Sequence, residues 1–563
     1  MKRILLPLLI LSVFAASMSA QRGNNIDARK LQLALYAISN LYVDSTSETK
    51  LVEDAIVGML EKLDPHSTYT DPEETKEMTE PLQGNFDGIG IQFNMLTDTL
   101  YVIQVIPGGP SEKVGLMAGD RIIMVDDTLI AGVKMKNTDV MKRLRGPKNT
   151  EVRVKVLRGG VPDLIEFKIT RGKIPVYSLD AAYMADKTTG YIKLNRFAAS
   201  SADEFQEALE KLKKQGMKNL ILDLQGNGGG YLNIAIDLAD EFLGKDKLIV
   251  YTEGNKQPRE EAKSSARGGF EEGRLVVLVD ETSASASEIL SGAVQDWDRG
   301  VVVGRRTFGK GLVQKPIPMP DGSMIRLTVA RYYTPTGRSI QKPYVNGNQE
   351  QYNHDLIDRY NRGELMSADS IHFPDSMKYN TLETKRIVYG GGGIMPDIFI
   401  PRDTSGVTSY FSNVVNSGML NLYALEYSDR NYDKLASFKT YQDLHKYLQQ
   451  QPLLSDFTNY AAAKGIKKRP HLINISGKLI EKQIQAYIVR NFFDEAGFYP
   501  IFQNDDITLK RAVKVLNEGK SFPTLENKNN TPNGIAQSQT NTSRGYGFLK
   551  EIIYEDYIAG SLC

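Results

Sequence analysis

The chain has 563 residues, which is long enough for three or four folding units with separate hydrophobic cores. Lys and Arg total 69 against 68 for Asp and Glu, so the net charge of +1 gives no electrostatic reason to expect a nucleic acid as partner. With one Cys, Cys563, and five His, the chain excludes an intramolecular disulfide and argues against a Cys/His zinc site. We expect neither a metal nor a cofactor.

Residues 1–20 have the pattern of a secretory signal. Lys2 and Arg3 precede an apolar run from Ile4 to Ala16, and mostly small residues follow up to Ala20. The run is shorter than the roughly 20 residues that span a bilayer, which favours a cleaved signal over an uncleaved membrane anchor. We therefore expect an exported protein, periplasmic or extracellular, that is soluble after cleavage.

The next two regions differ in their periodicity. Residues 21–84 are predicted to be helical, because apolar residues recur there at helical spacing. Residues 85–172 are predicted to form β-strands between Gly, Pro and Asp turns, with short helices near 111–114 and 138–144.

Two segments of the β-rich region resemble PDZ domains. One is Gly88-Ile89-Gly90-Ile91, and the other is residues 115–122, with Gly-Leu-Met-Ala-Gly-Asp at its start. Glycines let a tight loop direct N–H groups at a C-terminal carboxylate, and the strand that follows offers an edge to an extended peptide. The resemblance implies that this region binds free C-termini of proteins or peptides. An ordinary β-hairpin with two structural glycines is the alternative.

Residues 173–400 alternate predicted strands and helices, which indicates a largely parallel sheet. Residues 226–230, the glycine loop, follow a buried strand that ends at Leu224, and the serine cluster at 282–288 follows another that ends at Asp280. Because the carboxyl ends of parallel strands lie at one edge, we expect the two segments to meet there.

Ser285 is predicted to lie at the start of a helix, where the helix dipole favours developing negative charge. Its spacing from Glu288 also fits a capping box, so capping is the alternative role.

Lys310 lies between two glycines and beside apolar residues, within 307–314. A lysine has a reference pKa of about 10.4, so it acts as a base near neutral pH only if its surroundings lower that pKa. A neutral lysine could accept the proton of a serine hydroxyl. A surface charge or an anion clamp is the alternative for Lys310.

Residues 283–288 and 308–314 together resemble the carboxyl-terminal processing proteases, also called tail-specific proteases, of peptidase family S41. Further likenesses lie at 222–230, 333–340 and 393–397. The resemblance implies an α/β multidomain fold. It would combine a PDZ-like β domain with a ClpP/crotonase-like α/β protease core and with helical N-terminal and C-terminal regions.

The resemblance also implies roles for individual residues. Ser285 matches the nucleophile, Lys310 its general base, and Gln314 the residue that orients the lysine. The backbone amides of Gly229 and Ala286 match the oxyanion hole.

The chain departs from the family pattern in the glycine loop. Gly228 stands where the family often has Pro, and Gln225-Gly226 stands where a charged pair is common. Arg145 is a candidate for coupling the PDZ-like domain to the protease core, and a solvated turn arginine is the alternative.

The remaining regions lie outside the resemblance. Residues 401–526 are predicted to be helical, and 527–563 to be a polar linker and tail. Homo-oligomerisation and adaptor docking stay open as roles for the helical region.

The sequence as a whole predicts an exported serine endopeptidase that cleaves proteins near their C-termini by a Ser/Lys acyl-enzyme mechanism, with the PDZ domain gating the site. A Ser/His/Asp mechanism is disfavoured because no His lies between residues 173 and 345. The alternative is a non-catalytic PDZ scaffold of the same fold that binds peptides.

Overall fold

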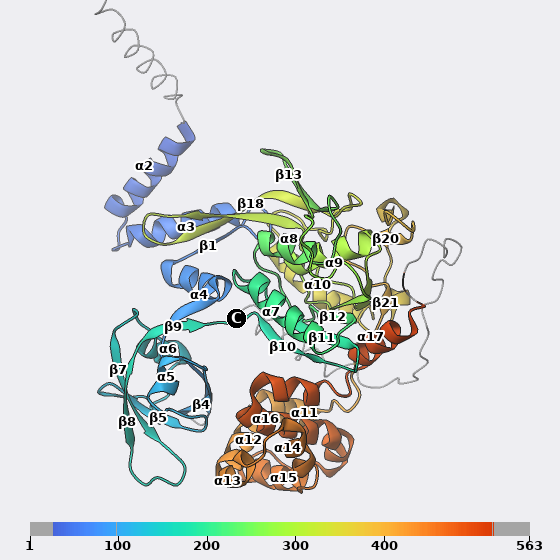
Figure 1. The fold of residues 1–563 in the computed structure, drawn as a ribbon. Helices are drawn as coiled ribbons and strands as arrows, with labels where there is room; N and C mark the ends of the chain where they lie inside the picture. Colours follow the sequence, from blue (N-terminus) through green and yellow to red (C-terminus); the bar gives the residue numbers. More distant parts are fainter. Residues whose placement is uncertain (1–25, 97, 521, 523–563) are drawn as a thin grey trace, which may run out of the picture. The chain divides into compact units, whose positions relative to one another are not determined.

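The computed structural model describes residues 26–96, 98–520 and 522 and divides into two compact units (Figure 1). The first unit contains residues 26–72, 315–328 and 344–352, and the second contains the other described residues. The predicted signal at 1–20 and the predicted tail at 527–563 lie outside the described residues.

The first unit begins with helices, as predicted from the spacing of apolar residues. Its elements are α2 (Ile26–Leu41), α3 (Glu48–Leu60) and β1 (Thr68–Thr70). The hydroxyl of Ser47 accepts the N–H of Lys50 and so caps α3. β1 pairs antiparallel with residues 324–326, at the start of β18 (Met324–Tyr333).

In the second unit, the β-rich region forms one antiparallel sheet with strand order β3-β4-β5-β7-β8, and β6 pairs with β5. Its elements are β3 (Ile91–Leu96), β4 (Thr99–Val105), α5 (Pro110–Lys113), β5 (Arg121–Val125), β6 (Thr128–Leu129), α6 (Asn137–Leu144), β7 (Glu151–Leu157) and β8 (Ile165–Thr170). Alternate residues point to one face, so Val152, Val154 and Val156 of β7 are all buried in its core. The two short helices predicted here are confirmed, and β3 is an edge strand.

Two elements flank this sheet. The helix α4 (Pro72–Gln83) precedes it, and β2 (Asn85–Gly88) pairs antiparallel with β9 (Gly172–Pro175). The N–H of Ala199 donates to the carbonyl of Leu82, which ties the end of α4 to the next sheet.

The central sheet has strand order β10-β11-β12-β15-β16-β21. From β11 to β21 the strands are parallel, as predicted, and β10 is antiparallel to β11. The elements are β10 (Leu179–Met184), β11 (Thr189–Leu194), α7 (Ser201–Lys214), β12 (Asn219–Asp223), α8 (Leu232–Asp240), β15 (Leu275–Val279), α9 (Ala286–Asp296), β16 (Val301–Gly304) and β21 (Ile398–Phe399).

Both faces of this sheet are buried, which explains why β15 has five consecutive buried apolar residues. Leu222 and Val277 face a core shared with α7, α8 and α9. Val276 and Leu278 face the opposite side, where α17 (Ile507–Glu518) packs. The end of the C-terminal helical region therefore forms one layer of the central domain.

The chain between α8 and α11 contains further elements. They are β13 (Leu248–Gly254), β14 (Gln257–Lys263), β17 (Leu312–Pro318), α10 (Gln349–Asn361), the 3-10 helices at Ala368–Ser370 and Asp375–Met377, β19 (Lys378–Asn380) and β20 (Ile387–Tyr389). β13 pairs with β14 and with residues 331–333 of β18.

The C-terminal region is helical, as predicted. Its helices α11 to α16 pack around one apolar cluster and are α11 (Ser409–Asn416), α12 (Met419–Arg430), α13 (Tyr432–Ala436), α14 (Tyr441–Leu448), α15 (Leu453–Ala463) and α16 (Pro470–Phe502). The backbone leaves helical geometry at Phe493 and Asp494, so α16 is two helical segments joined at a kink.

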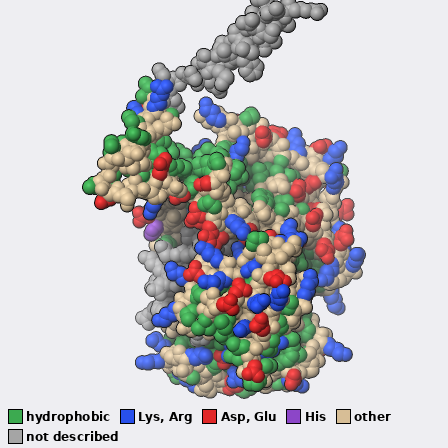
Figure 2. All heavy atoms as spheres, turned by 90° about the vertical axis from the view of Figure 1, so that its left-hand side faces the viewer, with side chains coloured by type: hydrophobic (Ala, Val, Ile, Leu, Met, Phe, Trp, Pro, Cys, Tyr) green, Lys and Arg blue, Asp and Glu red, His purple; other side chains and the backbone are tan. Residues whose placement is uncertain are grey.

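Within the part of the chain that the structure describes, none of the helices combines the length and apolar character needed to cross a membrane. On the face drawn in Figure 2, acidic and basic side chains are intermixed, which agrees with the net charge of +1.

Candidate active site

The glycine loop and the serine cluster meet at the carboxyl edge of the central sheet, as predicted. The hydroxyl of Ser283 donates to the carbonyl of Leu224 at 2.8 Å, and the hydroxyl of Ser287 donates to that of Asn227 at 2.9 Å. The carboxylate of Asp280 accepts the N–H of Gly226 at 3.1 Å. Two loops that are more than fifty residues apart in sequence are thus joined directly.

Ser285 differs from the serines on either side of it. Ser283 and Ser287 are fully buried, and their hydroxyls bond to the end of the preceding strand and to the glycine loop, whereas Ser285 is partly exposed. Ser285 is the N-cap of α9 and has φ 54° and ψ −111°. A non-glycine residue with positive φ is strained, and such strain is concentrated at functional sites.

The carboxylate of Glu288, which is fully buried, joins the serine cluster to the loop that carries Lys310. Its Oε2 accepts the N–H of Ser285 and the N–H of Lys310, both at 2.8 Å. Its Oε1 accepts the Thr307 hydroxyl at 2.5 Å and the Gly309 N–H at 2.7 Å. The main chains of Ser285 and Lys310 are therefore neighbours, held by one oxygen atom.

The electrostatics of Glu288 follow from its burial. Burial raises the pKa of the carboxyl, and the hydrogen bonds from Thr307, Lys310, Ser285 and Gly309 act in the opposite direction. The sequence pattern identified Glu288 only as a helix cap, so its contact with the lysine loop was missed.

Further contacts hold the lysine loop. The N–H of Phe308 donates to the carbonyl of Ser283 at 3.0 Å, and the N–H of Gly311 donates to Oε1 of Gln341 at 2.8 Å. Lys310 is partly exposed, and Gln314 lies four positions later on β17.

The neighbouring Lys342 lies 4.1 Å from the ring centre of Phe308 and 3.0 Å from the carboxylate of Asp355. Burial lowers the pKa of Lys342 to about 8, although the charge of Asp355 acts in the opposite direction. This second lysine was not identified from the sequence.

The glycine loop touches the serine directly. Gly229 has φ +105°, and a Cβ atom there would lie 3.1 Å from the nitrogen of Ala286. Ala286 is the first residue of α9, so its N–H lies at the positive end of the helix dipole. The N–H of Gly229 donates to Oδ1 of Asn227 at 2.8 Å, a contact that the sequence did not suggest.

The predicted PDZ residues lie at the start of their sheet. Gly88 ends β2, Ile91 begins β3, and Gly90 between them has φ +78°. The carbonyls of Ile89 and Gly90 accept backbone N–H groups of residues 111 and 106, which fixes the shape of the loop next to the edge strand.

Arg145 follows α6 and is partly exposed, and its side chain is paired. Its Nη1 lies 2.7 Å from Oε2 of Glu80 on α4, and its guanidinium lies 4.6 Å from the ring centre of Phe86. Because the end of α4 also bonds to Ala199, Arg145 takes part in a series of contacts between the β3-β4-β5-β7-β8 sheet and the central sheet.

Comparison with known families gives four matches. Peptidase family S41 matches residues 188–350, a PDZ domain matches 88–169, and the activating protease CtpB N-terminal domain matches 12–75. A family of unknown function, DUF8443, matches residues 410–494.

Individual proteins are also similar. The carboxy-terminal-processing protease of Bartonella bacilliformis is 38% identical over 306 residues, which are 53% of this chain and 69% of that protein. The carboxy-terminal processing protease CtpB of Bacillus subtilis is 35% identical over 336 residues, which are 58% and 68% of the two chains. The solved photosystem II D1 C-terminal processing protease is 30% identical, with a TM-score of 0.32, over 55% of this chain and 89% of that one.

Proposed function

The chain belongs to the carboxy-terminal processing proteases of peptidase family S41, and we propose that it is an exported endopeptidase that cleaves proteins near their C-termini through an acyl-enzyme on Ser285. The observation that carries this assignment is the shared hydrogen-bond acceptor, Oε2 of Glu288, which keeps the main chains of Ser285 and Lys310 together.

In the proposed reaction, the neutral amine of Lys310 accepts the proton of the Ser285 hydroxyl while Oγ bonds to the scissile carbonyl carbon. The carbon–nitrogen bond then breaks, and Lys310 returns the proton to the leaving amine. Lys310 then accepts a proton from water as the water oxygen bonds to the acyl carbon. The bond from that carbon to Oγ breaks, Lys310 returns the proton to Oγ of Ser285, and the product leaves as a carboxylate. Gln314 would orient the lysine amine.

The N–H groups of Ala286 and Gly229 would stabilise the tetrahedral oxyanion. Loss of one such donor typically costs about 10² to 10³ in rate. Because Gly229 donates to Asn227 in the structure, its N–H has to turn from Oδ1 of Asn227 toward the oxyanion as the reaction proceeds.

Substrate choice is assigned to the PDZ domain. The loop at residues 88–91 would bind the terminal carboxylate, and the edge strand β3 would pair with the extended peptide. Arg145 would transmit the bound state to the core through Glu80. Export rests on the signal pattern at residues 1–20.

A peptide library with defined C-termini tests the function by mass spectrometry of the products. Wild type should cleave, while Ser285→Ala and Lys310→Ala should leave all peptides intact at unchanged stability. Lys315→Ala, a change at an exposed lysine, is the matched control and should cleave normally. Binding without cleavage by wild type would instead identify a scaffold.

The PDZ assignment has its own test. Peptides that end in a free carboxylate should bind and be cleaved better than the same peptides with a C-terminal amide. Deletion of residues 85–172 should remove that difference, and an unchanged preference would exclude the PDZ role.

A further inference from the structure

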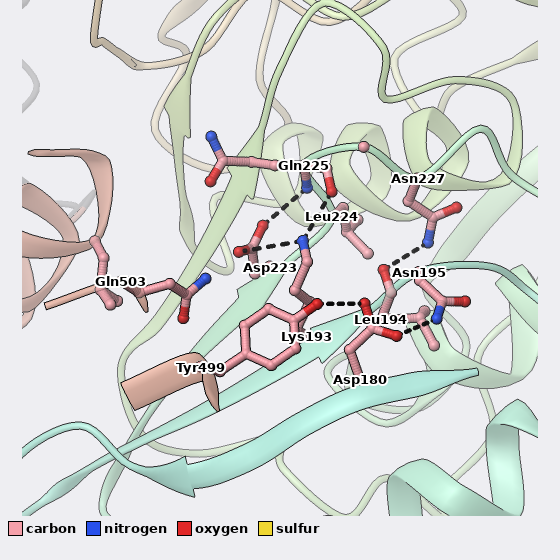
Figure 3. A network of polar contacts seen from close by, with 12 residues as sticks. Asp180, Lys193, Leu194, Asn195, Asp223, Leu224, Gln225, Asn227, Tyr499 and Gln503 are labelled. Atoms are coloured by element: carbon pink, nitrogen blue, oxygen red, sulfur yellow. Dashed lines mark hydrogen bonds and ion pairs between the residues drawn. The ribbon is translucent and has the colours of Figure 1, made fainter. Parts of the chain in front are cut away.

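A largely buried ion pair lies next to the start of the glycine loop (Figure 3). Lys193 on β11 lies 3.6 Å from the carboxylate of Asp223 on β12, and their side chains are 15% and 2% exposed. The amine of Lys193 also donates to the carbonyl of Gln225 at 2.9 Å. Since Gln225 immediately precedes the glycine loop, this lysine fixes the point where the loop leaves the sheet.

Asp223 also bonds to the backbone of Gln225. Its carboxylate accepts the N–H of Gln225 at 2.8 Å and the hydroxyl of Tyr191 at 2.5 Å. A buried ion pair is seldom more stabilising than apolar side chains of similar size, so stability alone does not account for the pair.

The end of α16 contacts this network. The amide of Gln503 donates to the hydroxyl of Tyr191 at 2.6 Å, and the hydroxyl of Tyr183 donates to Oε1 of Gln503 at 3.0 Å. Contacts thus run without interruption from Gln503 through Tyr191 and Asp223 to Gln225.

A second series of contacts runs in parallel. The hydroxyl of Tyr499 on α16 donates to Asp180 at 2.8 Å, and Asp180 accepts the side-chain amide of Asn195. The neighbouring carbonyl of Leu194 accepts the side-chain amide of Asn227 at 2.9 Å. Asn227 in turn accepts the N–H of Gly229.

Both series of contacts start at residues that no family match covers. Tyr499 and Gln503 lie beyond the S41 match at 188–350 and the DUF8443 match at 410–494. Given the function proposed above, we propose that Lys193 is a positioning residue for the glycine loop, and that Gln503 and Tyr499 make α16 part of its support. The C-terminal helical region then acts on catalysis through the oxyanion donors.

Two variants test this proposal. Lys193→Met removes the amine but keeps the length of the side chain, and Gln503→Leu breaks the contact with α16 even if Lys193→Met fails to fold. Each should lower kcat about 100-fold with little change in KM, because small displacements of oxyanion donors cost about that much. Lys193→Arg should recover part of the loss.

Gln485→Leu is the matched control, because Gln485 lies on α16 and bonds to His445 within the helical region. It should lose stability comparably to Gln503→Leu yet keep the wild-type kcat. If kcat falls equally in Gln485→Leu and Gln503→Leu, the contacts of Gln503 contribute only to the stability of the fold, and the proposal is overturned.

Amide hydrogen exchange separates this proposal from the proposed function, because it needs no substrate. Exchange at residues 225–230 should accelerate on the order of tenfold in Lys193→Met and Gln503→Leu but not in Gln485→Leu. Faster exchange in a protein that cleaves no peptide would support the coupling and contradict the peptidase assignment. Unchanged exchange in both variants would overturn the coupling.

Discussion

A Cβ atom on Gly229 would lie 2.9 Å from the Cβ of Ser285. No real pair of side chains is that close, so the glycine loop and the serine approach each other only because residue 229 has no side chain.

Gly229→Ala should therefore lower peptide cleavage by about 10² to 10³, because the loop must retreat from Ser285 and take its N–H donor with it. Gly228→Ala is the matched control, since nothing lies within 4 Å of a Cβ at that position. Initial rates on one good peptide measure both. Equal rates for the two variants would contradict the assigned position of the loop.

Glu288→Gln should fold but lose about 100-fold in kcat, because two of the four donors around the carboxylate would face an NH₂ group instead of an oxygen. Each unsatisfied buried donor costs about 1–3 kcal/mol, so the melting temperature should fall as well. Glu241→Gln replaces one oxygen of another buried carboxylate that accepts a backbone N–H, that of Gly269, and should lower stability without loss of kcat.

Lys342 should make stability depend on pH. Its pKa is about 8 in the folded chain against 10.5 when unfolded, so between these values the unfolded state binds more protons. The free energy of unfolding of wild type relative to Lys342→Met should therefore rise from pH 8 to about 10.5 and stay level below pH 7. Denaturant titrations of both proteins measure this difference in the free energy of unfolding. A difference that stays constant from pH 8 to about 10.5 would refute the lowered pKa.

Arg338→Met should destabilise the core by about 3–5 kcal/mol, because it leaves the fully buried carboxylate of Asp296 without its partner at 2.7 Å. Adding Asp296→Asn should recover part of the loss, since the amide oxygen can still accept the N–H of Thr336. Thermal unfolding of the single and double variants gives both values. If the double variant is no more stable than Arg338→Met, the loss of stability does not come from the unpaired carboxylate of Asp296.

Much of the site could be predicted from the sequence because it depends on local pattern. A glycine loop and a serine cluster that each follow a buried strand meet wherever those strands are parallel. That topology brought the segments around Gly229 and Ser285 together.

Contacts between distant residues could not be predicted. Glu288 caps its own helix in the sequence pattern, but its bonds to Gly309 and Lys310 depend on where a later loop returns. Lys193 and Asp223 face each other only through the register of two strands, and nothing in the spacing of Gln503 indicates that it reaches them.

The packing of α17 also affects the order in which the protein can mature. Leu509, Ala512, Val515 and Leu516 cover apolar residues of the central sheet that would otherwise face water. The strands with Ser285 at their edge are synthesised more than two hundred residues before that cover. A nascent chain therefore exposes one apolar face of the central sheet until synthesis has passed residue 518, so this sheet completes its packing only after α17 has been made.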